Sequence, residues 1–179
     1  AGDKAAANAT PRTIRYQPGH RQEFWHRNCV AIGMSSGFVE PLEASALVMI
    51  ELAAGMIAEQ LPPTRDVMDL VARRYNRKFQ RHWDQIIEFL KLHYVLSARH
   101  DTPYWQDNHA AASIPEKLRE QLSLWRYRSP WQQDAEAVDA LFPVASYQYI
   151  LYGRGFETEP RPTRSQLQAQ HLASELFRE

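Results

Sequence analysis

Apolar residues recur along the chain with the spacing of two consecutive helices. From residue 46 to residue 61 nearly every position is apolar, which predicts a buried helix. From residue 66 to about residue 97 the apolar positions return with a period of roughly 3.6, which predicts a long amphipathic helix. These positions are Val67, Val71, Tyr75, Phe79, Trp83, Ile86, Leu90 and Tyr94. Pro62 and Pro63 break the chain between the two helices.

A β-hairpin is predicted upstream of the helices. Residues 12–16 alternate polar and apolar side chains like a strand, residues 17–20 have the composition of a turn, and residues 23–32 return as a second strand. Two strands alone are marginally stable in water, so this hairpin is expected to pair with a larger sheet. Because the chain has no other convincing strand, we expect it to be the C-terminal part of a larger protein.

Shorter helices are predicted in the second half of the chain. Thr102 and Pro103 should cap a short helical turn, and Pro115 should open a helix that runs from residue 114 to about residue 127. Further helical segments are expected at residues 129–141 and 163–177, and residues 144–152 are expected to form a compact aromatic segment that ends at Gly153. The predicted fold is therefore mainly α, with an N-terminal β-hairpin that leads into a helical domain.

Composition and charge narrow the class of protein. The chain has 179 residues, of which 44% are hydrophobic and 23% are charged, as in an ordinary globular domain. Lysine and arginine together number 21, and so do aspartate and glutamate, so no overall field attracts nucleic acid or an anionic membrane. The single cysteine, Cys29, excludes an internal disulfide and fits a reducing cytoplasm. Because Cys29 lies in an apolar segment, we expect an inert, buried thiol.

No targeting or membrane segment is predicted. Residues 1–10 are small and polar, and they lack the hydrophobic core of a secretory signal. Residues 42–61 approach membrane-spanning length, but glutamates interrupt them, and glutamate is costly in lipid. The sequence thus predicts a soluble cytoplasmic protein with no nucleic-acid or membrane partner.

The histidines do not indicate a metal site. His82 and His93 return to nearly the same face of a helix but lie about 16 Å apart along it, which is too far to share one ion. His100, Asp101 and His109 fall in a loop without a convincing ligand spacing. We therefore predict no metal ion.

The run from Gly33 to Ser45, GMSSGFVEPLEAS, joins a short apolar strand to the first long helix. Glycine and serine let a ligand approach the main chain closely, and the first turn of a helix presents unpaired N–H groups. A strand, a turn and a helix start in this order suit an anion or the edge of a planar cofactor. On the pattern alone, a tight turn that packs a core helix is an equally good interpretation.

A longer run at residues 28–45, NCVAIGMSSGFVEPLEAS, resembles the signature of the C-terminal half of the flavin-dependent tryptophan halogenases. The likeness continues in Leu92-His93-Tyr94 and in residues 99–105 and 147–153, and it covers most of residues 12–156. The resemblance implies an enzyme that uses reduced FAD, oxygen and a halide, chloride or bromide, to halogenate tryptophan, indole or a related aromatic compound. A separate flavin reductase is the implied partner, and the oligomeric state, a homo-oligomer included, stays open.

The resemblance also assigns roles to individual residues. Glu43 matches the family's catalytic glutamate, which lies at the substrate end and works with a lysine. The backbone N–H groups that hold the halide fall on Ser45 and Ala46, which requires a helix that begins near Ala44; the alternative is a helix that begins at Pro41. Flavin contacts fall on Gly33, Met34, Ser35 and Leu47, and substrate contacts fall on His93, Tyr94, His100, Tyr104 and Trp105.

Two features depart from the family pattern. The halide pair is Ser45-Ala46, where the family usually has Thr or Ser followed by Gly or a small residue, and alanine resists the φ > 0 conformations that glycine allows. His100 stands where the tryptophan-specific enzymes have an acidic residue, and histidine is a poor partner for the ammonium group of free tryptophan. A different indole or a phenolic compound is as good a candidate substrate.

Tyr104 and Trp105 should face the same cavity as Glu43 and stack on a planar ring there.

Three family segments are absent from the 179 residues: the G-x-G-x-x-G nucleotide fingerprint, the catalytic lysine and the W-x-W-x-I-P segment. The chain is therefore expected to be a fragment of a larger α/β flavoprotein, to lack the FAD-binding module and to be inactive alone. Residues 1–40 would be the remnant of that module, and residues 41–179 the helical substrate-side domain. Two alternatives remain open, an FAD-dependent aromatic monooxygenase and a non-catalytic helical binding module.

Overall fold

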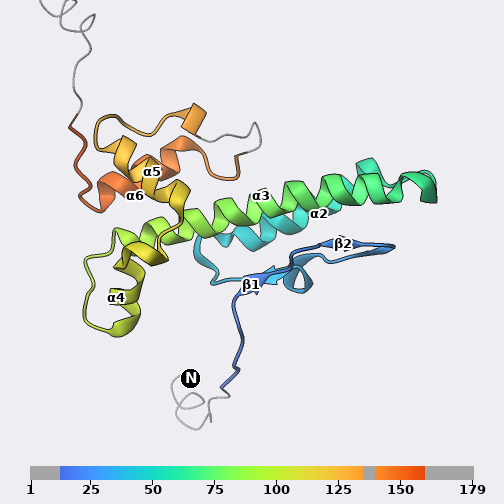
Figure 1. Cartoon of the computed structure of the whole chain (residues 1–179), viewed down its shortest axis with the longest axis horizontal. Helices are drawn as coiled ribbons and strands as arrows, with labels where there is room; N and C mark the ends of the chain where they lie inside the picture. Colours follow the sequence, from blue (N-terminus) through green and yellow to red (C-terminus); the bar gives the residue numbers. More distant parts are fainter. Residues whose placement is uncertain (1–12, 135–139, 160–179) are drawn as a thin grey trace, which may run out of the picture. The chain divides into compact units, whose positions relative to one another are not determined.

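The computed structural model describes residues 13–134 and 140–159, and helices dominate these two ranges (Figure 1). The contacts divide the chain into two compact units, Ala1–Phe79 and Gln80–Glu179. The longest helix, α3 (Met68–Val95), contributes to both units. The mainly helical fold with a small β-hairpin region is thus confirmed. The functional division predicted at residue 40 concerns cofactor and substrate roles, and it stays a prediction.

The β-hairpin region consists of two small antiparallel sheets. Strand β2 (Trp25–His26) pairs with β3 (Cys29–Val30), with Trp25 opposite Val30. Strand β1 (Gly19–His20) pairs with β4 (Gly37–Phe38), with Gly19 opposite Phe38. The first sheet is a tight hairpin whose turn contains Arg27 in the left-handed region, at φ 55°. Both sheets lie in the first unit.

The predicted strand positions need correction. Residues 13–16 form no strand and are exposed, whereas the predicted turn at residues 17–20 contains β1. The predicted second strand, residues 23–32, folds back on itself and becomes β2 and β3. Alternation of polar and apolar residues shows that a segment could pair, but the partner decides whether it does; β1 finds its partner beyond the predicted hairpin. Cys29 is exposed and not buried, because β3 is short and the neighbouring segments leave its thiol uncovered.

The tight hairpin is fixed to α3 by aromatic packing and by one asparagine. Phe24 and Trp25 are buried against the first half of α3, where the Trp25 and Tyr75 rings meet edge to face with centroids 5.5 Å apart. The Tyr75 ring in turn stacks on Phe79 at 4.2 Å. Asn76 accepts the backbone N–H of Phe24 at 2.9 Å and that of Trp25 at 2.8 Å, and its Nδ2 donates to the Trp25 carbonyl at 2.9 Å. One side chain therefore satisfies three backbone groups of the hairpin.

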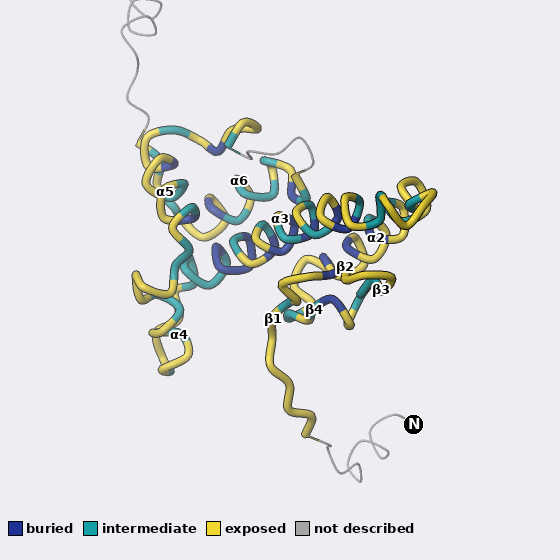
Figure 2. Tube along the Cα trace, turned by 45° about the vertical axis from the view of Figure 1, so that its right-hand side comes forward, coloured by how far each residue is buried: buried dark blue, intermediate teal, exposed yellow. Residues whose placement is uncertain are grey.

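Helix α2 (Ser45–Gln60) begins and ends within one residue of the predicted bounds, but it is not a buried helix. Ser45, Met49 and Ala53 are buried along one face, while Leu47 is 70% exposed and Ile50 is also exposed. The colour of the tube along α2 accordingly changes between buried and exposed (Figure 2). The prediction of burial is wrong for this chain. Apolar side chains make burial of a helix favourable, but burial also requires another segment that packs on the helix. No helix in the two described ranges is both long and apolar enough to cross a membrane.

The second unit is built on the second half of α3. Phe89 is fully buried there, and its ring stacks on Phe142 with centroids 4.0 Å apart and meets Tyr147 edge to face at 4.8 Å. Helix α5 (Glu116–Trp125) contributes the buried Trp125, and α6 (Val144–Gly153) contributes the buried Leu151. The apolar positions predicted for the long helix therefore face the core, as the 3.6-residue period requires.

The shorter helices follow the prediction in part. Helix α4 (Pro103–His109) starts with proline at its first position, as predicted, and α5 lies inside its predicted range. The predicted aromatic segment at residues 144–152 is helical and forms α6, which extends one residue further, to Gly153. Short 3₁₀ helices occur at Gly33–Ser35 (η1), Leu42–Ala44 (η2), Arg65–Val67 (η3), Ala111–Ser113 (η4) and Gln132–Asp134 (η5). In the described part of residues 129–141 the predicted helix is reduced to η5. The predicted helix at residues 163–177 lies outside the described residues.

Candidate active site

The turn that follows β3 is shaped by glycine and serine. Gly33 has φ +61°, and a Cβ added there would lie 3.3 Å from the Ile50 side chain, so only glycine fits this backbone without strain. Ser35 Oγ accepts the Ile32 N–H at 3.0 Å and donates to the Ile32 carbonyl at 2.8 Å. Ser36 Oγ donates to the Gly33 carbonyl at 2.6 Å. The serines thus hold the turn through hydrogen bonds to its own backbone.

Helix α2 begins at Ser45 and not at Pro41. Glu43 (φ 63°) and Ala44 (φ 50°) both adopt the left-handed conformation, and Ser45 is the first residue with right-handed helical angles. The helix therefore begins where the halide assignment of Ser45 and Ala46 requires, with its first backbone N–H groups at that end. A left-handed non-glycine residue costs about 1–2 kcal/mol, so two in succession store strain at this helix start.

The predicted residues of the first unit differ in exposure. Ser45 is buried, whereas Met34 is 81% exposed and Leu47 is 70% exposed. Glu43 and Ala46 are exposed as well. Met34 and Leu47, the two large apolar side chains with a predicted flavin contact, are thus accessible from outside the chain.

The strain at Ala44 leads to a stability prediction. Ala44→Gly should raise the free energy of unfolding by about 1 kcal/mol, because glycine adopts φ 50° without a Cβ clash. Ala54→Gly is the matched control: Ala54 is exposed inside α2, where glycine should lower the free energy of unfolding by about 1 kcal/mol. Urea unfolding followed by tryptophan fluorescence measures both. Equal destabilisation by the two substitutions would contradict the strained helix start.

In the second unit, three predicted substrate residues form one cluster, which we call the aromatic turn: Tyr94, Tyr104 and Trp105. The Tyr94 ring lies 6.1 Å from Tyr104 and 5.8 Å from Trp105, centroid to centroid. Pro103 at the first position of α4 sets the direction of the two residues that follow it. The Arg99 guanidinium lies 4.6 Å from the Trp105 ring centroid. Tyr104 is 56% exposed, so the cluster offers an aromatic surface and is not a closed core.

The two predicted histidines take different positions. His100 is exposed and stacks on His109 with ring centroids 4.2 Å apart, and His109 is bound through Nδ1 to the carbonyl of Trp105. His93 donates from Nδ1 to the Phe89 carbonyl at 2.8 Å and meets the Phe89 ring edge to face. The structure therefore brings His100 to the aromatic turn, while His93 is engaged with Phe89. Within the described residues no group of three or more His, Cys, Asp or Glu side chains could hold a metal ion.

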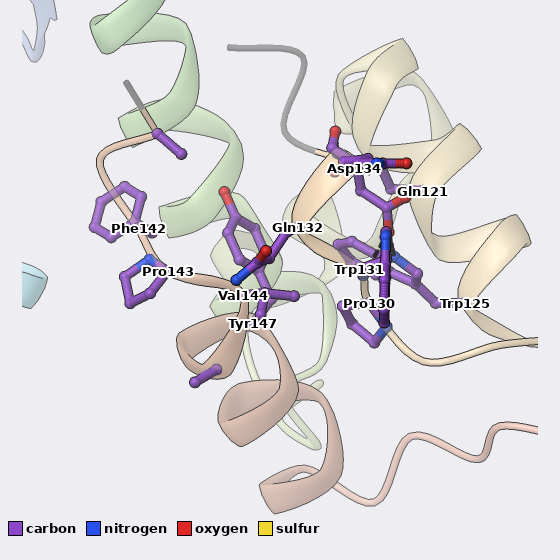
Figure 3. A pocket seen from close by; sticks show the side chains of 13 residues that line it. Gln121, Trp125, Pro130, Trp131, Gln132, Asp134, Phe142, Pro143, Val144 and Tyr147 are labelled. Atoms are coloured by element: carbon purple, nitrogen blue, oxygen red, sulfur yellow. Dashed lines mark hydrogen bonds between the residues drawn. The ribbon is translucent and has the colours of Figure 1, made fainter. Parts of the chain in front are cut away.

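A separate pocket of about 730 Å³ lies between α5, η5 and α6 (Figure 3). None of the residues with a predicted role lines it. Its aromatic walls are Trp125, Trp131, Phe142 and Tyr147. Sequence analysis missed this pocket because its walls come from separate segments without a shared motif; the high number of aromatic residues was the only signal.

Asp134 orders one wall of that pocket. Its carboxylate accepts the Trp125 Nε1–H and the Trp131 backbone N–H, both at 2.9 Å, and it pairs with Arg128. Burial alone would raise the pKa of Asp134, but the hydrogen bonds from Arg128, Trp125 and Trp131 outweigh it and lower the pKa. A carboxylate with all of these donors stays ionised and serves as a structural anchor.

Comparison with known proteins matches the chain to tryptophan halogenases. The protein family described as tryptophan halogenase matches residues 3–170 of the chain. Tryptophan 6-halogenase SttH from Streptomyces toxytricini is 36% identical over 150 residues, which is 84% of this chain and 28% of the relative.

Two solved structures extend this result. The crystal structure of a tryptophan halogenase from Shewanella frigidimarina NCIMB 400 is 50% identical, with a TM-score of 0.83 over 99% of this chain and 34% of the other. BrvH, a flavin-dependent halogenase from Brevundimonas sp. BAL3, is 31% identical, with a TM-score of 0.75 over 93% of this chain and 33% of the other. The chain thus spans about a third of the length of these relatives.

Proposed function

Because the chain belongs to the tryptophan halogenase family, whose members are flavin-dependent, we propose that it is the substrate-side part of an enzyme that halogenates a small aromatic compound. One observation carries this proposal. Two left-handed residues, Glu43 and Ala44, delay the start of α2 to Ser45, directly beside a turn that only glycine can make. A plain core-packing turn would not require this strain.

We propose that the turn and the exposed part of α2 form one side of a flavin site. Gly33 allows close approach of the main chain, Met34 and Leu47 offer exposed apolar side chains, and Ser35 keeps the turn in shape. These features fit a flat, largely apolar ring system. Bound as reduced FAD, the cofactor would supply electrons that reduce oxygen, and the oxidant so formed would oxidise the halide.

The halide, chloride or bromide, is proposed to bind at the start of α2. The backbone N–H groups of Ser45 and Ala46 are the first in the helix, and they carry the positive end of its dipole. Ser45 has φ −56° and Ala46 is not among the residues with positive φ, so the pair needs no left-handed conformation, and alanine in the second position leaves both N–H donors in place.

Glu43 is proposed to act on the aromatic substrate. Its carboxylate sits on the left-handed residue just before the helix, next to the proposed halide donors. A carboxylate there can hold the lysine that the rest of the enzyme would supply, or accept the proton that leaves the ring carbon after halogenation. Both roles require the negative charge.

The aromatic turn is proposed to hold the substrate ring. The rings of Tyr94, Tyr104 and Trp105 adjoin one another, and His100 contacts His109, whose Nδ1 lies against the Trp105 carbonyl oxygen. Rings with few rotatable bonds bind a planar ligand at low entropic cost. His93 also belongs to this proposed substrate set, and from its place against Phe89 it would support the position of Tyr94 on α3.

The exposed apolar face of α2 supports the proposal that the complete protein has a flavin-binding module that this chain lacks. Leu47, Val48 and Ile50 are exposed side by side, and an apolar surface of this kind marks an interaction site. We propose that the FAD-binding module covers this face, that residues 1–40 belong with that module, and that residues 41–179 form the substrate side. A separate flavin reductase would deliver the reduced cofactor.

The isolated chain should not bind FAD tightly. A titration of the 179-residue chain with FAD, followed by flavin fluorescence and by the melting temperature, should show no saturation in the micromolar range and no thermal shift. The complete protein, measured in parallel, should bind and be stabilised, because ligand binding adds to the free energy of unfolding. Micromolar binding by the isolated chain, with a clear rise in its melting temperature, would show that no module is missing.

A further inference from the structure

The charge state of His109 follows from its hydrogen bonds. Its Nδ1 lies 2.6 Å from the carbonyl oxygen of Trp105, and its Nε2 lies 2.8 Å from that of Ser97. A carbonyl oxygen only accepts, and a neutral imidazole has one N–H. Both contacts are hydrogen bonds at once only if His109 is an imidazolium, so the geometry points to a positive charge fixed at the end of α4.

A second cation lies at the same end of α4. Lys91 of α3 is buried, and its Nζ donates to Asn108 Oδ1 at 2.7 Å and to Ser113 Oγ at 2.9 Å. Asn108 in turn donates from Nδ2 to the carbonyl of Tyr104 at 2.9 Å. Burial lowers the pKa of Lys91, as expected for an ammonium group whose partners are uncharged. Lys91 is therefore linked to the aromatic turn through Asn108, and in the described part of the chain it has no carboxylate partner.

The charged groups around the aromatic turn do not cancel. Arg99 is paired with Asp101, with Nη2 and Oδ2 2.9 Å apart, and Asp107 is exposed on α4. Against these two carboxylates stand Arg99, Lys91 and the inferred imidazolium of His109. With that imidazolium the excess is positive, and among residues 13–134 and 140–159 the hydrogen-bond partners of Lys91 and His109 are neutral.

His100 is placed to bind an anionic group of a ligand near these positive charges. Its ring is exposed and stacks on the His109 ring at 4.2 Å, and within the described ranges its nitrogens have no hydrogen-bond partner. An imidazole N–H of His100 can donate a hydrogen bond to an anionic group that lies against this pair of rings.

We propose that the substrate of the aromatic turn is an aromatic compound with an anionic side group, an indole carboxylate for example, and that compounds with an ammonium group are rejected. This inference rests on the proposed function, because it takes the aromatic turn to be the substrate site. The rings of Tyr94, Tyr104 and Trp105 bind the aromatic part, and His100 with His109 binds the carboxylate. The preference is a difference between two affinities, set by attraction of one charge and repulsion of the other.

Binding of three probes to the complete protein tests the proposal: indole-3-propionate, tryptamine and indole. The carboxylate should bind at least about tenfold more tightly than the amine, a difference of the size expected for one partly exposed charge pair. His100→Glu should remove or reverse that preference, whereas Arg119→Gln, which removes an exposed positive charge on α5, should leave it unchanged.

The outcomes distinguish failure of the proposed function from failure of the charge preference alone. If none of the three probes binds, the aromatic turn is not a substrate site, and the proposed function fails together with this inference. If indole binds but tryptamine binds as tightly as indole-3-propionate, only the charge preference is overturned.

Nitrogen-15 NMR of labelled histidines measures the charge of His109 independently, with His109→Gln to assign the signal. Two protonated ring nitrogens in neutral buffer support the imidazolium, and a single protonated nitrogen overturns it.

Discussion

Glu43→Gln should lower halogenation by the complete protein about 100-fold or more, the size typical of a lost general acid–base group. Glutamine keeps the size and hydrogen-bonding capacity of glutamate but not its charge, so it can neither hold a cationic lysine nor take the proton from the ring. Oxygen consumption by the reduced flavin should continue, because the change lies on the substrate side.

The control for this prediction is Glu120→Gln, which removes an exposed carboxylate from α5. It should leave product formation within about twofold of the unchanged protein, since a surface charge of this kind contributes little. Product is measured by chromatography with mass detection, and folding by circular dichroism. Halogenation by Glu43→Gln at the unchanged rate, in a folded protein, would remove Glu43 from the active site.

The largest expected effect on stability is that of Asn76→Ala. The substitution leaves the N–H groups of Phe24 and Trp25 and the carbonyl of Trp25 without their partner, and we expect a loss of about 2–4 kcal/mol in the free energy of unfolding. Asn76→Asp should lose less, because a carboxylate still accepts both N–H groups although it cannot donate to the carbonyl.

A matched control for Asn76 is Arg73→Ala, on the exposed side of the same helix. It should change the free energy of unfolding by no more than about 0.5 kcal/mol. Urea unfolding followed by the fluorescence of Trp25 and the other tryptophans measures all three variants. An effect of Asn76→Ala as small as that of Arg73→Ala would show that the hairpin is held by aromatic packing alone.

Local periodicity predicted the helices well and the strands poorly. The run of apolar residues from Val67 to Tyr94 has one period throughout, and a helix needs no partner to satisfy its backbone, so α3 could be predicted closely. Strands need a partner, and β1 pairs with β4 across an intervening hairpin that no local pattern reveals. Exposure of α2 was equally hidden, because it depends on what else is present to cover the helix.

The candidate site was predictable in its residues but not in its geometry. Resemblance to the family marked Glu43 and Ser45, yet two successive left-handed non-glycine residues follow no sequence rule. The aromatic turn is recognisable from Thr102 and Pro103, which fix the start of α4. The two hydrogen bonds of His109 required the structure, since its partners are backbone carbonyls that every sequence supplies.

The most direct test of the central claim is the mass of the product. The complete protein, given reduced FAD, oxygen, bromide and a mixture of tryptophan, indole and indole-3-propionate, should yield a brominated aromatic product. Omission of bromide should abolish this product, and the 179-residue chain alone should give none. A hydroxylated product that forms without bromide, or bromination by the isolated chain, would contradict the account.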